Sequence, residues 1–502
     1  MSAGRPSIFF YMEFAKAIPE AGYRIITFIM FYFCTLFLYK ILKNWLLLSD
    51  RACFWICAIY IVIPSYDCRA LLAVFPYSIG LFFFMAGMST LSVILREKQM
   101  TWSYRILLWL LFGIGFTLNS NLCFYAIVLL MILMMTRSIK GCIKYLDFFI
   151  LPIVFFGVKG QCFPTYGAYE DYNSITIKNL FTAIKYIVPA DLYMLKELCR
   201  NFFLCFTGTN MVWEICTGLM VVFVIRNRKK IFSVLGQIFE SYYNSEKQEV
   251  IICKKIKSED VWICIIGLVA LSAGLFSYVA VRLSYKIPAS LLGGRDAVLV
   301  SFGAAMLIYG MFSLVFDFKM DICIFLLLIS CGLIYFNAYY LSYQQDYYRQ
   351  LGFQYQLKEH MELGNLSNIV YLNSDVSLVN IHTLYALNGS AEIVYDNQER
   401  LIMGGFGETL FLEDDYWLDY FVESGNYHMS QYDRSHKRID AVVQYSFDVN
   451  LKETLKMKVY EIMDDSRFED WIQNRSNLVV YLDGTEEYNQ LLSDYGYENI
   501  EE

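Results

Sequence analysis

The stretch Gln161-Cys-Phe-Pro-Thr-Tyr-Gly-Ala-Tyr-Glu-Asp-Tyr-Asn173 opens a long polar and aromatic interruption that continues to about Arg200. Apolar runs of membrane-spanning length lie on both sides of it. Long connections in compact architectures tend to carry function. We therefore expect the segment 160–206 to be a loop at one face of a membrane protein, and part of a binding or catalytic surface.

The composition supports a membrane protein. The chain is 57% hydrophobic and only 18% charged, whereas soluble domains carry about 25% charged residues. Its apolar runs predict a polytopic α-helical membrane domain over residues 23–342 with about ten spans. The expected spans are roughly 24–45, 52–66, 71–95, 105–118, 121–136, 144–159, 207–225, 260–282, 296–316 and 320–341.

Basic residues predict the orientation of the spans. Alternate short loops are rich in Lys and Arg, which is typical of cytoplasmic loops, and the basic loop 226–259 belongs to this set. The segment 1–22, which is amphiphilic, then lies outside the cytoplasm as an interfacial segment. The segment 160–206 and the C-terminal region lie on the same outer side. A chain that starts outside without a signal peptide suggests a further helix upstream.

The C-terminal region differs in charge from the rest. Residues 341–502 hold 29 of the 48 acidic residues and 11 of the 41 basic ones, a net charge of −18 against +11 for the remainder. We expect residues 343–502 to form an acidic, soluble, extracytoplasmic α/β domain, which is a poor partner for nucleic acid. Its expected strands are 368–372, 391–395, 440–445 and 478–482, and its expected helices 347–362, 377–386 and 484–495.

No metal site is predicted. All 14 cysteines lie at or before Cys331, mostly in apolar runs where a free cysteine packs as a small hydrophobic residue. The four histidines lie in the C-terminal domain without ligand spacing. The sequence Gly404-Gly405-Phe-Gly407 lacks the Lys and Ser/Thr partners of a phosphate loop.

Three basic residues stand out because they lie on the predicted outer side, against the usual charge bias. A lipid phosphate or pyrophosphate is a natural counter-ion for them, and Arg binds such groups bidentately. Alternatively, they extend to lipid headgroups or pair with Asp296. These candidates for a donor phosphate site are Arg282, Lys286 and Arg295.

Other outer-face residues are candidates for substrate binding. Asp67 and Arg69 either pair with each other or face a shared outer cavity. Aromatic rings next to carboxylates and amides suit a sugar surface, although the same residues could simply form an aromatic belt at the bilayer. The candidates in the long segment are Tyr166, Tyr169, Glu170, Asp171 and Asn173. The outer carboxylates that could serve as a general base are Glu13, Glu20, Glu170, Asp171 and Asp191.

The layout resembles bacterial membrane glycosyltransferases of the GT-C superfamily, in particular glucosyltransferase-like proteins that modify surface polysaccharides. The likeness is carried by Gly4-Arg5-Pro6 with its following aromatics, by Phe163–Asn173, by Gly294-Arg295-Asp296 and by the outer α/β domain. It covers nearly the whole chain, but its motifs are loose.

The resemblance implies a polyprenyl-phosphate-linked sugar as donor and a cell-surface polysaccharide or wall polymer as acceptor. It also implies an acidic residue in the first outer loop that activates the acceptor hydroxyl. In the family this acidic pair precedes the Gly-Arg-Pro segment, where this chain has only Met1 to Ala3. Glu13 is the nearest acid and a weak catalytic candidate. The resemblance leaves a divalent metal requirement open.

The sequence thus predicts a multi-pass cell-membrane protein related to glycosyltransferases. Two alternatives remain at this stage. One is a transporter of polysaccharide or lipid-linked sugar, for which ionisable residues at mid-membrane depth and internal repeats are typical; Glu214 is the main such residue and no repeat is evident. The other is a non-catalytic relative that lacks the catalytic loop.

Overall fold

A computed structural model gives the architecture. It describes residues 18, 20–71, 74–163, 177–207, 226, 253–289, 291–315, 318–366, 368–373, 384–395, 401–405 and 440–494. The chain divides into two compact units, Met1–Ala338 and Tyr339–Glu502. This division lies close to the boundary at 342/343 expected from the sequence. Each unit is described by itself.

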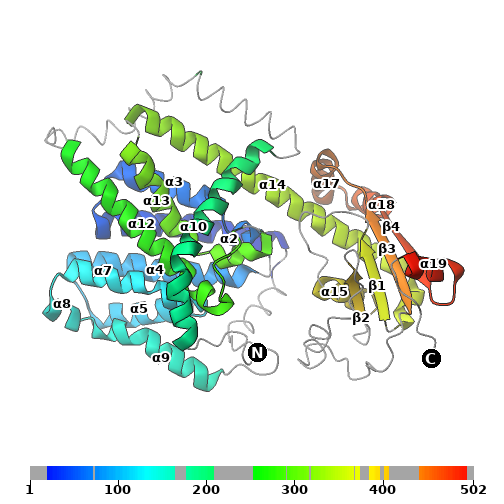
Figure 1. Ribbon diagram of the computed structural model, residues 1–502, viewed down its shortest axis with the longest axis horizontal. Coiled ribbons are helices and arrows are strands. Elements are labelled where there is room, and N and C mark those ends of the chain that lie inside the picture. The colour runs from blue at the N-terminus through cyan, green and yellow to red at the C-terminus, as the bar shows by residue number, and fades with distance from the viewer. Residues whose placement is uncertain are drawn as a thin grey trace. The chain divides into compact units, whose positions relative to one another are not determined.

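The first unit is helical throughout its described residues (Figure 1). Most of its described helices follow from the expected apolar runs. They are α2 (Glu20–Ile41), α3 (Asp50–Val62), α4 (Phe75–Glu97), α5 (Trp102–Gly115), α7 (Ala126–Thr136), α9 (Leu146–Cys162), α12 (Cys253–Arg282) and α13 (Val300–Val315). The other described helices are α6 (Ser120–Phe124), α8 (Ile139–Ile143) and α10 (Ile177–Thr207), with α14 (Phe318–Glu359) continuing into the second unit.

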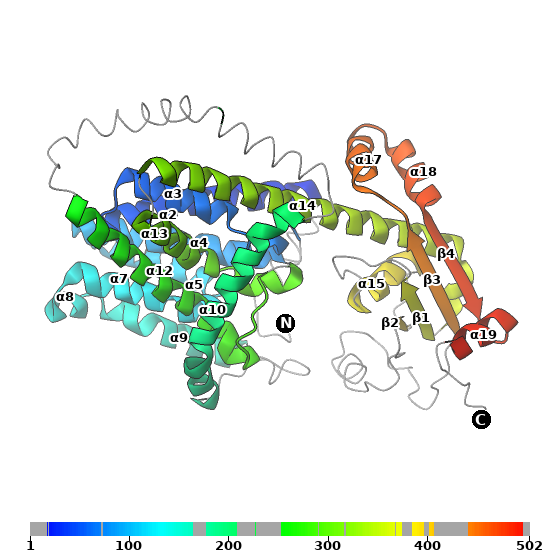
Figure 2. The same ribbon diagram turned by 45° about the horizontal axis from the view of Figure 1, so that its top comes forward.

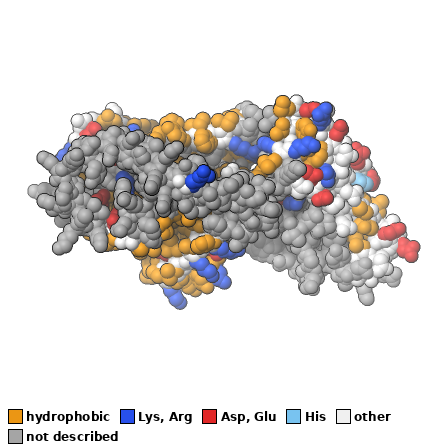
Figure 3. All heavy atoms as spheres, turned by 90° about the horizontal axis from the view of Figure 1, so that it is seen from above, with side chains coloured by type: hydrophobic (Ala, Val, Ile, Leu, Met, Phe, Trp, Pro, Cys, Tyr) orange, Lys and Arg blue, Asp and Glu red, His pale blue; other side chains and the backbone are white. Residues whose placement is uncertain are grey.

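Four described segments are long and apolar enough to cross a membrane: Gly22–Leu46, Phe75–Glu97, Glu259–Arg282 and Ile324–Glu359. Trp102–Gly115, Ser120–Thr136 and Val300–Val315 are apolar but shorter. The expected span 207–225 lies outside the described residues, and the count of about ten spans stays a prediction. On the face seen in Figure 3, hydrophobic side chains reach the surface over the described helices, as in proteins that contact lipid.

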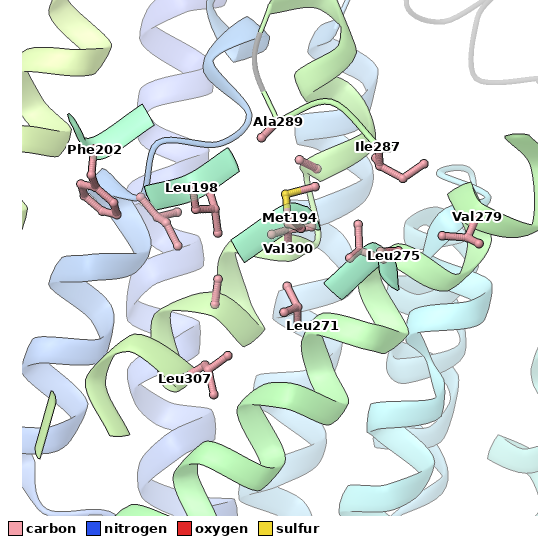
Figure 4. Packing of buried hydrophobic residues seen from close by; sticks show 14 of the residues in the cluster. Met194, Leu198, Phe202, Leu271, Leu275, Val279, Ile287, Ala289, Val300 and Leu307 are labelled. Atoms are coloured by element: carbon pink, nitrogen blue, oxygen red, sulfur yellow. The ribbon is translucent and has the colours of Figure 1, made fainter. Parts of the chain in front are cut away.

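Helix α12 is central to this unit and packs closely on α13. A Cβ added to Gly267 would lie 2.8 Å from the backbone nitrogen of Leu307, and one added to Gly274 would lie 3.1 Å from the carbonyl of Leu299. Such close backbone approach through small residues is typical of helix pairs in membranes. Another side of α12 packs on α10 through Leu271, Leu275 and Val279, which meet Met194 and Leu198 in one buried cluster (Figure 4).

The segment 160–206, expected as a loop, contains the 31-residue helix α10. This helix runs across α4, α5 and α7 instead of alongside them (Figures 1 and 2). Polar residues interrupt the segment, so it contains no continuous apolar run from which a helix would have been predicted. The apolar residues recur every three to four positions instead, which is the period of an amphipathic helix.

The second unit contains a four-stranded sheet in the order β2-β1-β3-β4. Strand β1 (Asn368–Asn373) pairs in parallel with β2 (Leu401–Gly405) and β3 (Ala441–Phe447), and β4 (Ser476–Leu482) pairs antiparallel with β3. Tyr348, Phe353 and Leu357 of α14 pack with β3 in the core of this unit. The other described helices are α15 (Leu384–Tyr395), α17 (Leu451–Met463), α18 (Asp465–Arg475) and α19 (Glu486–Asp494).

One local expectation in this unit was wrong. Residues 391–395 form the end of α15, not a strand, although Ile393 and Val394 favour a strand locally. Tertiary contacts decide the outcome, because Ala391 is buried in the core and the Tyr395 hydroxyl donates to the carbonyl of Leu357 at 2.9 Å. The helix expected at 347–362 is present to Glu359, as the last part of α14. Strands at Asn368–Asn373, Ala441–Phe447 and Ser476–Leu482 were anticipated from their β-branched runs.

Candidate functional site

The candidate site lies where two short 3₁₀ helices of the first unit meet, η2 (Asp67–Ala70) and η5 (Leu291–Ala297). The Asp67 side chain is buried against the backbone of Gly294: a Cβ added to Gly294 would lie 2.7 Å from Asp67 Oδ1 and 3.3 Å from the carbonyl oxygen of Ala289. Position 294 therefore accommodates only glycine without a shift of η2 or η5. The contact joins two predicted outer-face motifs that lie far apart in the sequence.

Asp296 is shared by two arginines. Arg282, the last residue of α12, pairs through Nη2 with Asp296 Oδ2, and Arg295 Nε lies 3.9 Å from Asp296 Oδ1. The Asp296 side chain is only 7% exposed, whereas those of Arg282 and Arg295 are 39% and 41% exposed. Burial raises the pKa of Asp296 above its usual range, and the charges of Arg282 and Arg295 oppose that rise. One carboxylate thus faces two half-exposed cations.

The Tyr278 side chain contacts the backbone of Arg295. The Tyr278 hydroxyl on α12 lies 3.0 Å from Ser120 Oγ at the start of α6 and 3.5 Å from the carbonyl oxygen of Arg295. These partly buried contacts tie η5, at the backbone of Arg295, to α12 and α6. Neither Tyr278 nor Ser120 was singled out from the sequence, because the contact joins distant segments.

Cys68 lies within the same charged neighbourhood. Burial raises the pKa of the Cys68 thiol well above its usual range, the nearby carboxylates of Asp67 and Asp296 raise it further, and Arg295 opposes them. A thiol that stays protonated and has no accessible surface is not a nucleophile. Cys68 therefore acts as a packing residue between η2 and η5.

Arg69 binds within the fold. Its guanidinium lies over the ring of Phe336 at 4.1 Å and over the ring of Phe31 at 4.8 Å from the centroids. Its Nη2 also donates to the carbonyl of Ile61 at 3.4 Å. Cation–π contacts of this kind typically contribute about 0.5–2 kcal/mol. Through these contacts Arg69 links α2, α3 and α14, so its role is structural more than one of substrate binding.

Lys286 adds a further positive charge close to the end of α12. It is exposed, its Nζ lies 5.9 Å from the centroid of the Tyr285 ring, and it has no carboxylate partner among the described residues. Leu283, one residue beyond α12, adopts a left-handed backbone conformation with φ of 50°. The chain turns sharply there, and Arg282 and Lys286 flank this turn.

The structure thus brings Asp67, Arg282, Arg295 and Asp296 into one region. The other candidates, Glu13, Tyr166, Tyr169, Glu170, Asp171 and Asn173, lie outside the described residues. Within the described part of the chain, no group of three or more His, Cys, Asp or Glu side chains could hold a metal ion. In this cluster two half-exposed guanidiniums lie beside a buried carboxylate, and guanidinium groups of this kind suit contact with an anion.

A second buried carboxylate, Asp191 of α10, also contacts α12. Its Oδ2 accepts a hydrogen bond from Ser272 Oγ at 2.6 Å, whereas its Oδ1 is buried without a hydrogen-bond partner. Burial raises the pKa of Asp191 to about 6, and the Ser272 hydrogen bond opposes this rise. Asp191 was named from the sequence as one of several possible general bases, and its surroundings now mark it as a residue that exchanges its proton near neutral pH.

In comparisons with known proteins, no family model, no curated protein and no solved structure matches the chain. The functional argument therefore depends on the residues and their geometry.

Proposed function

We propose that this chain is a multi-pass membrane protein that binds a polyprenyl-phosphate-linked sugar, with Arg282 and Arg295 as the phosphate contacts. The observation that supports this most directly is the cluster at Asp296: two arginines, each about two fifths exposed, lie beside one buried carboxylate, and exposed Lys286 lies four positions after Arg282. A phosphate group carries negative charge and matches the planar donors of arginine.

The position of the cluster fits a lipid ligand. Arg282 ends the apolar segment Glu259–Arg282, one of the four long enough to cross a membrane. At the end of a span, a guanidinium lies at the level of lipid headgroups. The phosphate of a lipid-linked sugar would be at that same level, with its hydrocarbon chain among the helices.

The resemblance to GT-C glycosyltransferases gives this binding site a reaction. We propose sugar transfer to a cell-surface polysaccharide or wall polymer on the outer face, with the C-terminal α/β unit on the same side of the membrane. In such a reaction the arginines stabilise the phosphate as the sugar leaves it. The acceptor hydroxyl needs a general base, and Glu13 remains the weak candidate for that role.

The test is sugar transfer in proteoliposomes from a radiolabelled polyprenyl-phosphate donor. Arg295→Ala should lower transfer at least about tenfold, because loss of a charge-assisted phosphate contact costs roughly 1.5–3 kcal/mol. Arg96→Ala is the matched control. Arg96 is also an exposed arginine, it donates to Asn44 Oδ1 at 2.9 Å, and it belongs to the loops predicted to be cytoplasmic. Equal transfer by Arg295→Ala and the unaltered protein would refute the phosphate role.

A further inference from the structure

Helix α10 presents an apolar stripe to its surroundings. Its outward-facing hydrophobic residues recur every three or four positions between residues 181 and 192. Four of them are each between 60% and 70% exposed: Phe181, Ile184, Val188 and Leu192. Single exposed hydrophobic residues are ordinary, but a continuous stripe along a helix needs a partner.

The exposed charges of α10 all have the same sign. Lys178, Lys185, Lys196 and Arg200 are exposed, whereas both of its acids, Asp191 and Glu197, are buried. On an ideal helix of 3.6 residues per turn, the four bases fall along one flank of the apolar stripe. An apolar face with basic residues along its edge is the pattern of helices that lie on anionic lipid.

The helix cannot rotate to hide this stripe, because its opposite face is fixed. Met194, Leu198 and Phe202 belong to the buried cluster that includes Leu271 and Leu275 of α12 (Figure 4). Polar contacts support the same orientation: Asn201 Nδ2 donates to the carbonyl of Pro64 at 2.9 Å, and Asp191 accepts from Ser272.

The position of α10 also suits the membrane surface. It crosses the direction of α4 and α7 (Figures 1 and 2). Its Tyr186 and Tyr193 lie against the ring of Tyr285, with centroid distances of 6.1 and 6.3 Å, just beyond the end of α12. Tyrosines gather where a spanning helix leaves the hydrocarbon.

We propose that α10 is an interfacial helix that lies in the surface of a bilayer containing anionic lipid. The stripe of Phe181, Ile184, Val188 and Leu192 enters the acyl region, to a depth of roughly 5–10 Å for helices of this kind. The basic flank binds lipid phosphates. This proposal is independent of the phosphate role of Arg282 and Arg295, since it uses none of their contacts.

The first test places an environment-sensitive fluorescent amino acid at Val188, Leu192 or Arg200 of the full chain in lipid nanodiscs. All three positions are exposed, so the substitutions are compatible with folding. Brominated acyl chains should quench the label at Val188 and Leu192, which iodide in the water should not reach. At Arg200, iodide should quench the label more strongly than brominated acyl chains do.

Two outcomes of this test would overturn the proposal. Iodide quenching at Val188 as strong as at Arg200 would place the stripe in water. Protection of Val188 from both quenchers would mean that a protein surface, such as a second copy of the chain, covers the stripe.

The second test addresses the basic flank with the label kept at Val188. Brominated phosphatidylglycerol should quench this label about threefold more efficiently than brominated phosphatidylcholine in mixed nanodiscs, because a surface Lys near anionic lipid contributes about 1 kcal/mol. Lys185→Gln/Lys196→Gln should remove the difference. Lys358→Gln/Lys456→Gln, two exposed lysines of the second unit, should leave it unchanged. Equal quenching by the two lipids in the unaltered protein would refute anionic-lipid binding.

Discussion

Two Arg–Asp clusters of the first unit have the same chemistry but different surroundings. Arg105 Nη1 lies 2.5 Å from Asp147 Oδ1, its Nη2 donates to the carbonyl of Lys144, and Asp147 Oδ2 accepts from Trp109 Nε1 at 3.1 Å. Both side chains are only about one fifth exposed, 19% and 22%. In that cluster one base meets one acid, and Arg105 Nη2 and Asp147 Oδ2 both make further hydrogen bonds within the fold.

At Asp296 two arginines meet one acid, and each keeps about two fifths of its surface exposed. The difference shows that an ion pair alone does not indicate function. A mostly buried pair that makes several further contacts within the fold stabilises the structure, whereas a cluster with exposed arginines can bind a ligand. We therefore assign a structural role to Arg105–Asp147 and propose a binding role for Arg282 and Arg295.

The largest effect is expected at the structural pair. Arg105→Ala leaves a mostly buried carboxylate without its cation, which should lower the free energy of unfolding by about 3 kcal/mol. Arg295→Ala, at a half-exposed cation 3.9 Å from its partner, should lower it by less than about 1 kcal/mol. Thermal unfolding of both variants in detergent measures this difference. Equal losses of stability would contradict the distinction between the two clusters.

Asp191 is a third case, a carboxylate with a hydroxyl partner in place of a cation. Its pKa of about 6 in the folded protein lies above the ordinary value of 3.8. The folded protein therefore binds more protons than the unfolded chain between these values, and the contribution of Asp191 to stability falls as the pH rises through them. Asp191→Asn should raise the free energy of unfolding by about 2 kcal/mol at pH 8 and change it little near pH 4.

Melting temperatures of the unaltered protein and Asp191→Asn across pH 4–8 provide the measurement. Glu453, which pairs with Arg475 at 2.5 Å in the second unit, offers a control carboxylate with a cation. Glu453→Gln should not stabilise the protein at pH 8. A pH-independent effect of Asp191→Asn would show that Asp191 does not titrate in this range.

Packing around the anion site can be tested at Gly294. A Cβ at this position would lie 2.7 Å from the buried Asp67 carboxylate, so Gly294→Ala should cost about 1–2 kcal/mol through overpacking between η2 and η5. Gly113→Ala is the control: nothing lies within 4 Å of a Cβ there, and the substitution should stabilise helix α5 by roughly 0.5–1 kcal/mol. Unfolding of the two variants should therefore shift in opposite directions.

The smallest expected effect concerns charge at the site. Asp296→Asn removes the carboxylate that pairs with Arg282 and lies beside Arg295, and should tighten binding of a lipid phosphate by about fivefold, or roughly 1 kcal/mol at the high dielectric of an exposed site. Asp147→Asn should not change this affinity. Weaker phosphate binding by Asp296→Asn would show that Asp296 is needed to orient the arginines more than it competes with the ligand.

The sequence predicted those features that depend on local pattern. Apolar runs located α2, α3, α4, α5, α7, α9, α12 and α13, and β-branched runs located β1, β3 and β4. The amphipathic helix α10 was missed because only its period, not its mean hydropathy, distinguishes it from a polar loop. Its exposed positions 181, 184, 188 and 192 carry that period, and a search for helical spacing would have found them.

The site was predictable in its basic residues but not in its geometry. Arg282 and Arg295 stood out because positive charge on the outer side is unusual, and Asp296 was recognised as a competing partner. The approach of Asp67 to Gly294 and the Tyr278 contacts with Ser120 and Arg295 join distant segments. Such contacts depend on how helices pack in three dimensions, and no local pattern encodes them.

The central proposal is that the exposed arginines at Asp296 bind a lipid phosphate. The most direct measurement compares the binding of a polyprenyl phosphate and of the uncharged polyprenol to the full chain in nanodiscs. The unaltered protein and Arg105→Ala should bind the phosphate form at least about tenfold more tightly, a difference of about 1.4 kcal/mol, and Arg295→Ala should lose this preference. Equal affinity of the unaltered protein for the two lipids, or an unchanged preference in Arg295→Ala, would contradict the claim.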